Sequence, residues 1–302
     1  MSGHRSLRWR PTWALLGALA LLWRCGGDEL DSISELNKYR VLAVRAEPPS
    51  LAFGEQSELR VFDFHPDDLS GTEPERSYRW RLCLQSAGAV TRYECLIPEL
   101  DLEGTGATTT VDLLSLIAQL DQETRERLMS IGEEEVEGLE GPESPLGGGI
   151  DEAFDFSQGI PIYVKVTARA GDDQLEVVKQ LRIRLDANTP DNENPEIRAL
   201  VPTAPTRLIA GQSVELGVSL TEESVERYQV DGVEEEEEPF LSWASSGGKF
   251  ERSITDTDPG RNLLTLPTEP GPLRVYVVAR DRRGGVGIAE LDLTVEASGE
   301  SE

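Results

Sequence analysis

Two stretches decide the fold: Val44–Val61, VRAEPPSLAFGEQSELRV, and Val201–Val218, VPTAPTRLIAGQSVELGV, which match at a constant offset of 157 residues. The positions identical at that offset include Pro48 and Pro205, Leu51 and Leu208, Gly54 and Gly211, and Leu59 and Leu216. In each copy a strand ends in a kink that contains proline, Leu-x-x-Gly makes a turn, and alternating apolar residues begin the next strand. The chain therefore carries an internal repeat of a strand–turn–strand unit.

A second repeated block lies near the end of each copy. Residues 161–169 match residues 272–280 at an offset of 111, with Val164, Val166 and Ala168 aligned to Val275, Val277 and Ala279. Between the two blocks each copy has one tryptophan in a strand-like context, Trp80 in YRWRLCL and Trp243 in FLSWAS. Each copy is thus predicted to hold two opening strands, a tryptophan strand, a strong penultimate strand, an Asp/Gly turn and a closing strand.

This order resembles an immunoglobulin-like β-sandwich, in which a tryptophan fills the space between two sheets. The resemblance implies an all-β fold class with two such sandwiches in tandem, the first carrying a partly helical insertion. The strands around Leu59 and Leu216 contain no cysteine, so the copies look closer to the disulfide-free modules of bacterial surface proteins than to antibody domains. The predicted boundaries are 40–186 for domain 1, with the insertion at about 98–157, then a linker at 187–195, domain 2 at 196–297 and a tail at 298–302.

The insertion contains a candidate amphipathic helix. Thr110 is predicted to cap it, with one apolar face made by Leu113, Leu116, Ile117 and Leu120 and a continuation through Leu128 and Ile131 to Gly132. An apolar face must be covered, so the helix is expected to pack on the sandwich of its own domain, and docking of a partner is the alternative. The acidic, Gly-rich stretch 133–149 that follows is predicted to be a mobile loop.

Charge excludes several classes of function. The 302 residues include 29 Lys plus Arg against 56 Asp plus Glu, which gives a net charge of −27. Such a chain is repelled by nucleic-acid phosphates and by anionic lipid headgroups, so we expect neither nucleic-acid binding nor polybasic docking to a membrane. An exported domain with this charge is expected to stay soluble and monomeric.

The N-terminus, residues 1–25, is predicted to be an export signal with a lipobox. His4, Arg5, Arg8 and Arg10 form a basic start, and the 11-residue apolar run WALLGALALLW follows at 13–23. A helix needs about 20 apolar residues to cross a bilayer, so a permanent span is the weaker interpretation. Residues 26–39 would then form a tether.

Cys25 directly follows the apolar core, as in a bacterial lipobox, where the thiol receives diacylglycerol. Leu22 fits the outer position of that motif, whereas Trp23 and Arg24 stand where the family has small side chains. The resemblance therefore implies lipidation of Cys25. The alternatives are an ordinary signal cleaved near Gly26 or Gly27 and an uncleaved N-terminal anchor.

The number of cysteines, three, agrees with export. If Cys25 is lipidated, Cys83 and Cys95 remain as a pair that can form a disulfide. Alternation along the tryptophan strand places Cys83 on the face opposite Trp80, so the disulfide would tie a peripheral hairpin. The alternative is two free thiols in a cytosolic protein.

The sequence offers few parts for catalysis. Apart from His4 in the signal, the only histidine is His65, and the chain has no nucleophile elbow, no P-loop and no dinucleotide fingerprint. We therefore expect no enzymatic activity, no catalytic residue and no cofactor. Asp172 and Asp281 are predicted to start turns, and the Glu234–Glu238 run to be a solvated loop that could meet a basic partner.

One constellation could bind a cation. The linker supplies Asp186, Asn188, Asp191 and Glu193, which resembles the calcium linkers of cadherin-like repeats, although the order of Asp and Asn differs from that motif. The alternative is a plain polar hinge. No residue is assigned as a metal ligand.

Together these features predict a non-catalytic lipoprotein of the bacterial envelope, in the outer membrane or periplasm, which binds or scaffolds a protein partner. It would meet the membrane through its N-terminal lipid or signal anchor. The alternative function is a carbohydrate-binding or adhesive surface module, for which Tyr93 and Tyr228 are the candidate aromatic platforms.

Overall fold

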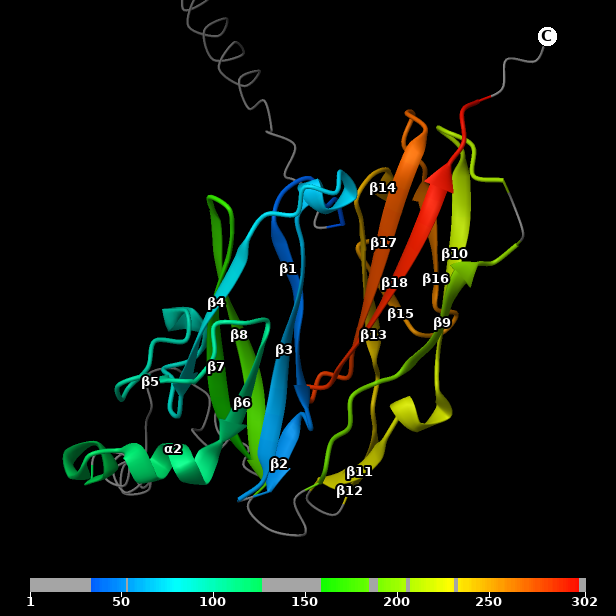
Figure 1. Ribbon diagram of the computed structural model, residues 1–302. Coiled ribbons are helices and arrows are strands. Elements are labelled where there is room, and N and C mark those ends of the chain that lie inside the picture. The colour runs from blue at the N-terminus through cyan, green and yellow to red at the C-terminus, as the bar shows by residue number, and fades with distance from the viewer. Residues whose placement is uncertain are drawn as a thin grey trace, which may run out of the picture. The chain divides into compact units, whose positions relative to one another are not determined.

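The computed structural model of the 302-residue chain describes residues 34–52, 54–126, 159–184, 190–204, 207–230 and 233–298. They form two β-sandwiches in tandem, which confirms the predicted fold class (Figure 1). The export signal, Cys25, Asp186, Asn188 and the whole stretch from 127 to 158 lie outside the described residues.

The first sandwich has a three-stranded sheet facing a five-stranded one. The smaller sheet has the order β1-β3-β6, with β1 at Arg40–Glu47, β3 at Gln56–Phe64 and β6 at Thr108–Asp112. The larger has the order β2-β8-β7-β4-β5, with β2 at Ser50–Ala52, β8 at Asp173–Arg184, β7 at Ile160–Ala170, β4 at Arg76–Cys83 and β5 at Leu100–Asp101.

The second sandwich has two four-stranded sheets and a small hairpin. One sheet has the order β14-β16-β10-β9, with β14 at Lys249–Phe250, β16 at Arg261–Thr265, β10 at Ser213–Leu220 and β9 at Ile197–Pro202. The other has the order β15-β13-β17-β18, with β15 at Ile254–Asp256, β13 at Phe240–Ser245, β17 at Gly271–Arg280 and β18 at Val286–Val295. The hairpin pairs β11 at Arg227–Val230 with β12 at Val233–Glu236.

The internal repeat is visible in the strand register. Trp80 on β4 lies opposite Val166 on β7, and Trp243 on β13 lies opposite Val277 on β17. Both tryptophans are almost fully buried, each in the apolar core of its own sandwich. Each ring also satisfies its one donor, because Trp80 Nε1 donates to Gly106 O at 3.0 Å and Trp243 Nε1 donates to Thr255 Oγ1 at 2.9 Å. The repeated sequence thus encodes a repeated core.

The helix of the insertion begins later than predicted and ends at Gln119, while its predicted continuation through Leu128 and Ile131 to Gly132 lies outside the described residues. It is α2, at Leu113–Gln119, and its N-cap is Asp112, whose carboxylate accepts from Ser115 N at 3.1 Å. The predicted cap, Thr110, is wrong because that residue lies in β6, opposite Glu58 of β3. Leu113, Leu116 and Leu120 join the core of the first sandwich, which confirms that the helix packs on its own domain. Within the described ranges, no helix is long and apolar enough to cross a membrane.

The structure also forms the predicted disulfide. Cys83, at the end of β4, is bonded to Cys95 and closes a hairpin in which Ala87 N donates to Glu94 O at 2.8 Å and Leu96 N donates to Gln85 O at 3.0 Å. Cys83 is fully buried and yet is not part of the tryptophan core, in agreement with its position on the opposite face of the strand. The disulfide therefore ties a hairpin that covers the outer face of the larger sheet.

Two adjacent leucines on β16, Leu263 and Leu264, provide a test of which residues form the core of the second sandwich. Leu264 is fully buried and Leu263 is 39% exposed, because neighbouring strand residues face opposite sides of the sheet. We expect Leu264→Ala to lower the free energy of unfolding by about 2–5 kcal/mol, and Leu263→Ala, the matched control, by less than about 1 kcal/mol. Urea denaturation of both variants checks this, and equal losses would contradict the assignment.

The disulfide gives a second prediction. Replacing Cys83 and Cys95 together by serine should lower the free energy of unfolding by about 3 kcal/mol, because the bond no longer restricts a loop of this length in the unfolded chain. Wild-type protein in reductant should move to the same value, and Cys25→Ser, the control, should not change. Thermal or urea unfolding with and without reductant measures the effect. If reductant left the free energy of unfolding of the wild-type protein unchanged, the prediction would be contradicted.

Candidate functional site

The two sandwiches meet along β1, β17 and β18. Ala43 of β1 packs against Val278 and Val286, and Phe64 of β3 packs edge-on against Tyr276 with ring centroids 6.0 Å apart. The segment before β1 joins the contact, because Leu36 N donates to Ser245 O and Ser245 N donates to Ser34 O, both at 2.8 Å. The last residues of the predicted tether are therefore docked on the second sandwich.

A groove of about 420 Å³ lies beside this contact. Strands β1 and β8 of the first sandwich form one wall, and Phe240 of β13 with the β17–β18 turn forms the other. Five cationic side chains line it, and no Asp or Glu is among its lining residues; the cations are Lys179, Arg182, Arg280, Arg282 and Arg283. This groove is the candidate functional site.

The β17–β18 turn is shaped by Asp281, which is 2% exposed. Its Oδ1 accepts from the backbone N–H groups of Arg283, Gly284 and Gly285 at 2.8, 2.9 and 2.9 Å. Gly285 is required by this close approach, since an added Cβ would lie 2.0 Å from Asp281 Oδ2. The prediction that Asp281 starts a turn is confirmed, and the turn is what places the arginines around it at the groove.

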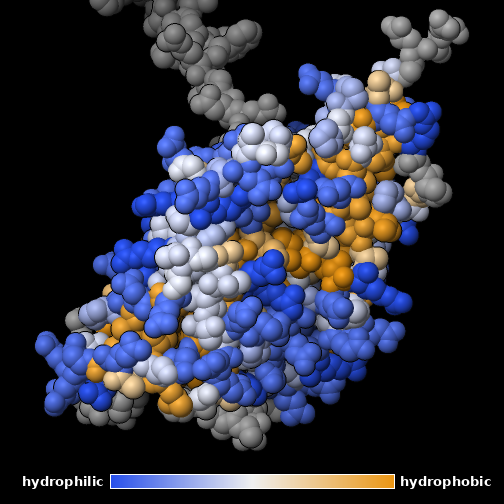
Figure 2. Space-filling model, viewed as in Figure 1, coloured by the Kyte–Doolittle hydropathy of each residue, from blue (hydrophilic) through white to orange (hydrophobic). Residues whose placement is uncertain are grey.

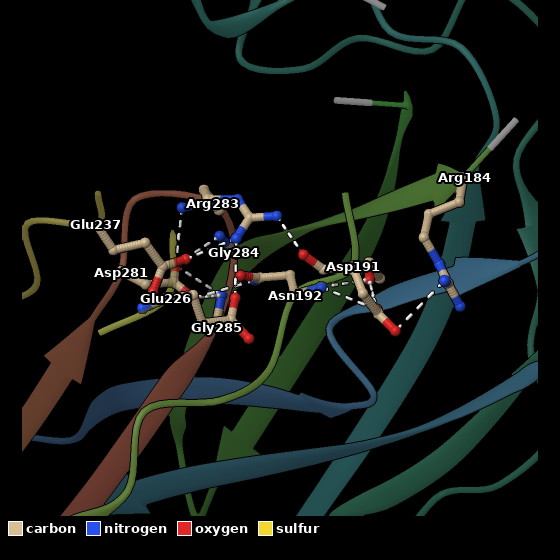
Figure 3. A network of polar contacts seen from close by, with 10 residues as sticks. Arg184, Asp191, Asn192, Glu226, Glu237, Asp281, Arg283, Gly284 and Gly285 are labelled. Atoms are coloured by element: carbon tan, nitrogen blue, oxygen red, sulfur yellow. Dashed lines mark hydrogen bonds and ion pairs between the residues drawn. The ribbon is translucent and has the colours of Figure 1, made fainter. Parts of the chain in front are cut away.

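The linker is hydrogen-bonded to both sandwiches (Figure 3). Asn192, 3% exposed, donates from Nδ2 to Asp281 Oδ2 at 3.0 Å, while Asn194 accepts from Val286 N at 2.8 Å and donates to Ala46 O at 2.7 Å. Asp191 accepts from Ser50 Oγ at 2.7 Å and pairs with Arg184 Nη1 at 3.3 Å. Protein donors thus occupy the carboxylate of Asp191, one of the four linker groups of the calcium hypothesis.

Arg283 forms a buried ion pair beside the linker (Figure 3). Its Nη1 lies 2.8 Å from Glu237 Oε1 and 2.9 Å from Glu226 Oε2, and its Nη2 donates to Asp191 O. Burial raises the pKa of Glu237 to about 7, although the hydrogen bond from Arg283 opposes the rise. The expectation that the Glu234–Glu238 run is only a solvated loop is therefore wrong for Glu237, which is 5% exposed and reaches under the turn.

Lys179, which is buried, and Arg280, which is half-buried, carry positive charge at the groove. Lys179 Nζ donates to Gly284 O, and burial lowers its pKa to about 8 even though Asp281 favours the charged form. Arg280 donates to Ser242 Oγ at 2.9 Å and to Leu42 O at 3.0 Å, and burial lowers its pKa as well. The acceptors of these hydrogen bonds, two carbonyl oxygens and one hydroxyl, are neutral.

The remaining predicted residues lie away from the groove or are used structurally. His65 caps the 3₁₀ helix η2, Pro66–Leu69, by accepting from Asp67 N at 3.2 Å. The ring of Tyr93 packs at a tilt against that of Tyr163, with centroids 5.1 Å apart. The guanidinium carbon of Arg283 lies 4.1 Å from the centre of the Tyr228 ring, so that ring is not an open platform for a sugar. Within the part of the chain that the structure describes, no group of three or more His, Cys, Asp or Glu side chains could hold a metal ion.

The cationic groove was not predicted from the sequence, although one signal was present. In β8, the residues that face the core are Leu175, Val177, Leu181 and Ile183, and Lys179 interrupts this apolar row. A lysine in a core row must find a polar exit. The amine of Lys179 finds its hydrogen-bond acceptor, Gly284 O, on the second sandwich, and the periodicity of a single strand cannot show this.

Comparison with known proteins does not assign the chain to a family. No family model and no curated protein sequence matches the chain. The FN1–FN3 domains of chicken CNTN1 are similar over 84% of this chain, with 9% identity and a TM-score of 0.25, and the chain spans less than two thirds of that structure, 64%. The D0–D1 domain of intimin is similar over 84% of this chain and 98% of its own length, with 12% identity and a TM-score of 0.21. At this level of similarity, the immunoglobulin-like assignment rests on the sheets and cores themselves.

Glu237 predicts a pH dependence. Its pKa is higher in the folded protein than in the unfolded chain, so its contribution to stability is complete below about pH 4.5 and is lost as the pH rises through about 7. We expect Glu237→Gln to remove this loss, so that the variant gains about 1–3 kcal/mol relative to wild type between about pH 5 and about pH 8.

The control is Glu235→Gln, an exposed member of the same glutamate run. It should follow the wild-type profile throughout. Urea denaturation at several pH values measures all three proteins. Parallel profiles for wild type and Glu237→Gln would show that the carboxyl group does not titrate in this range.

Proposed function

We propose that this protein is a non-catalytic binding or scaffolding module of the bacterial cell envelope, anchored by a lipid on Cys25 and presenting two immunoglobulin-like sandwiches to a protein partner. The carrying observation is the disulfide between Cys83 and Cys95. Disulfides persist in oxidising compartments and are rare in the cytosol, so the bond supports a location outside the cytoplasm. The basic, apolar N-terminus with a cysteine after its core supports export and lipidation.

A binding role is supported by how the chain uses its polar residues. His65 caps a turn, and the buried carboxylates of Asp281 and Glu237 hold the contact between the sandwiches, so these groups serve structure. Apolar surface suited to a partner runs along β18 and toward β9 (Figure 2), where Val201 is 51% exposed and Ile288, Leu291 and Leu293 are half-buried. Exposed apolar patches on soluble domains commonly mark interaction surfaces.

The intact mass of the protein from its native envelope fraction tests the proposal. We expect a chain that begins at Cys25, carries the mass of acyl groups, and gains the mass of two hydrogen atoms on reduction because one disulfide is present. Cys25→Ser is the control and should lose the acyl mass while keeping the disulfide. A chain that begins elsewhere without lipid would overturn the anchoring, and two free thiols in Cys83 and Cys95 would overturn the oxidising location.

A further inference from the structure

The groove between the sandwiches is electrostatically opposite to the rest of the chain. The whole sequence has a net charge of −27, yet five cationic side chains and no carboxylate line the groove. Clefts with walls of low dielectric concentrate the field of the charges that line them. A positive cleft in so acidic a chain therefore stands out as a site for a negative ligand.

The cations of the groove are not all neutralised by the protein. Arg283 has two carboxylate partners, Glu226 and Glu237, within 2.9 Å. By contrast, the hydrogen bonds of Lys179 and Arg280 go to two carbonyl oxygens and a hydroxyl. Among the charges near Lys179, Asp281 favours its ammonium form, whereas Arg280 disfavours it. Holding like charges together in a partly dry site costs free energy that an anion between them would relieve.

The groove also offers apolar surface next to the charges. Val41, Val178 and Phe240 line it together with the cations, and the guanidinium of Arg282 lies 5.8 Å from the centre of the Phe240 ring. Small-molecule sites typically combine such apolar walls with a few polar groups, in volumes of roughly 300 Å³ and above. At about 420 Å³, the groove has room for a small organic molecule.

We propose that the groove binds a small organic anion, whose carboxylate or phosphate head is held by Lys179, Arg280 and Arg282 and whose apolar body lies against Val41, Val178 and Phe240. Arginine and lysine supply several charge-assisted donors to such a head group. The site goes beyond the proposed function, because it depends on neither the lipid anchor nor the protein partner. It joins β8 of the first sandwich to β13 and β17 of the second, so a bound anion would also tighten the contact between them.

Calorimetric titration of the full chain, kept in solution by a non-ionic detergent, tests the site. The probes are benzoate and phenyl phosphate, with benzyl alcohol as the uncharged analogue and inorganic phosphate as the head group alone. We expect benzoate or phenyl phosphate to bind, and to bind more tightly than either comparison compound. The stronger of the two identifies the head group. Equal binding of benzyl alcohol, or no binding of either anion to folded protein, would overturn the proposal.

Three variants locate the binding. Lys179→Gln and Arg282→Gln should weaken it about tenfold and about threefold, because each removes a charged donor from the head group. Arg252→Gln, an exposed arginine of the second sandwich outside the groove, is the matched control and should leave the affinity unchanged. Circular dichroism verifies that each variant is folded. Equal losses in all three, or none in the first two, would place the anion elsewhere.

Proton uptake separates ligand binding by Lys179 from a merely structural role. Asp281 and Arg280 face this amine from the second sandwich, Arg182 lies on its own strand, and its pKa is about 8. An anion beside Lys179 favours the ammonium form, so binding near about pH 8.5 should take up protons. The uptake, read from the dependence of binding heat on the ionisation enthalpy of the buffer, should vanish in Lys179→Gln. Uptake that persists in this variant would exclude Lys179 from the site. Failure of this test leaves the mass measurement on Cys25 unaffected.

Discussion

The buried carboxylate of Asp281 is the group on which the contact between the two sandwiches depends. Its oxygens accept from three backbone N–H groups of its own turn and from the side chain of Asn192 in the linker. A buried charge is stable only when its oxygens are hydrogen-bonded, so the shape of the turn and the position of the linker are fixed together. The same turn presents the carbonyl of Gly284 to Lys179 and the guanidinium of Arg283 to its two glutamates.

Charge is distributed very unevenly in this molecule. On β12 the side chains of Glu234, Glu235 and Glu236 are solvated, whereas the groove gathers Lys179 with four arginines. Repulsion among exposed acids is weakened by water and salt. Repulsion inside the groove is weakened far less, because the surrounding apolar side chains keep water away. A counter-charge bound in the groove would therefore relieve repulsion that solvent relieves only in part.

The disulfide and the interdomain contact act on different parts of the fold. Cys83 and Cys95 secure a hairpin on the outer face of the larger sheet of the first sandwich. The linker, by contrast, bonds to Ser50 and Ala46 on one side and to Asp281 and Val286 on the other. This arrangement turns two modules into a unit with a defined groove, which a flexible hinge would not provide.

The sequence by itself determined each sandwich. The strand register shows, as predicted, the two repeated blocks and the alternation around Trp80 and Trp243. Cys83 also lies on the face of its strand opposite to that of Trp80. These features were predictable because they depend on contacts within one strand or between neighbouring strands. The cap of α2 is Asp112 and not the predicted Thr110, because Thr110 belongs to β6, and the pairing of β6 with β3 cannot be derived from the local sequence. Only the tertiary structure decided the groove: Lys179 and Arg280 are about a hundred residues apart in sequence, and they become neighbours because two independently patterned sandwiches pack side by side. Periodicity records which face of a strand is buried, and it carries no information about which other domain covers that face.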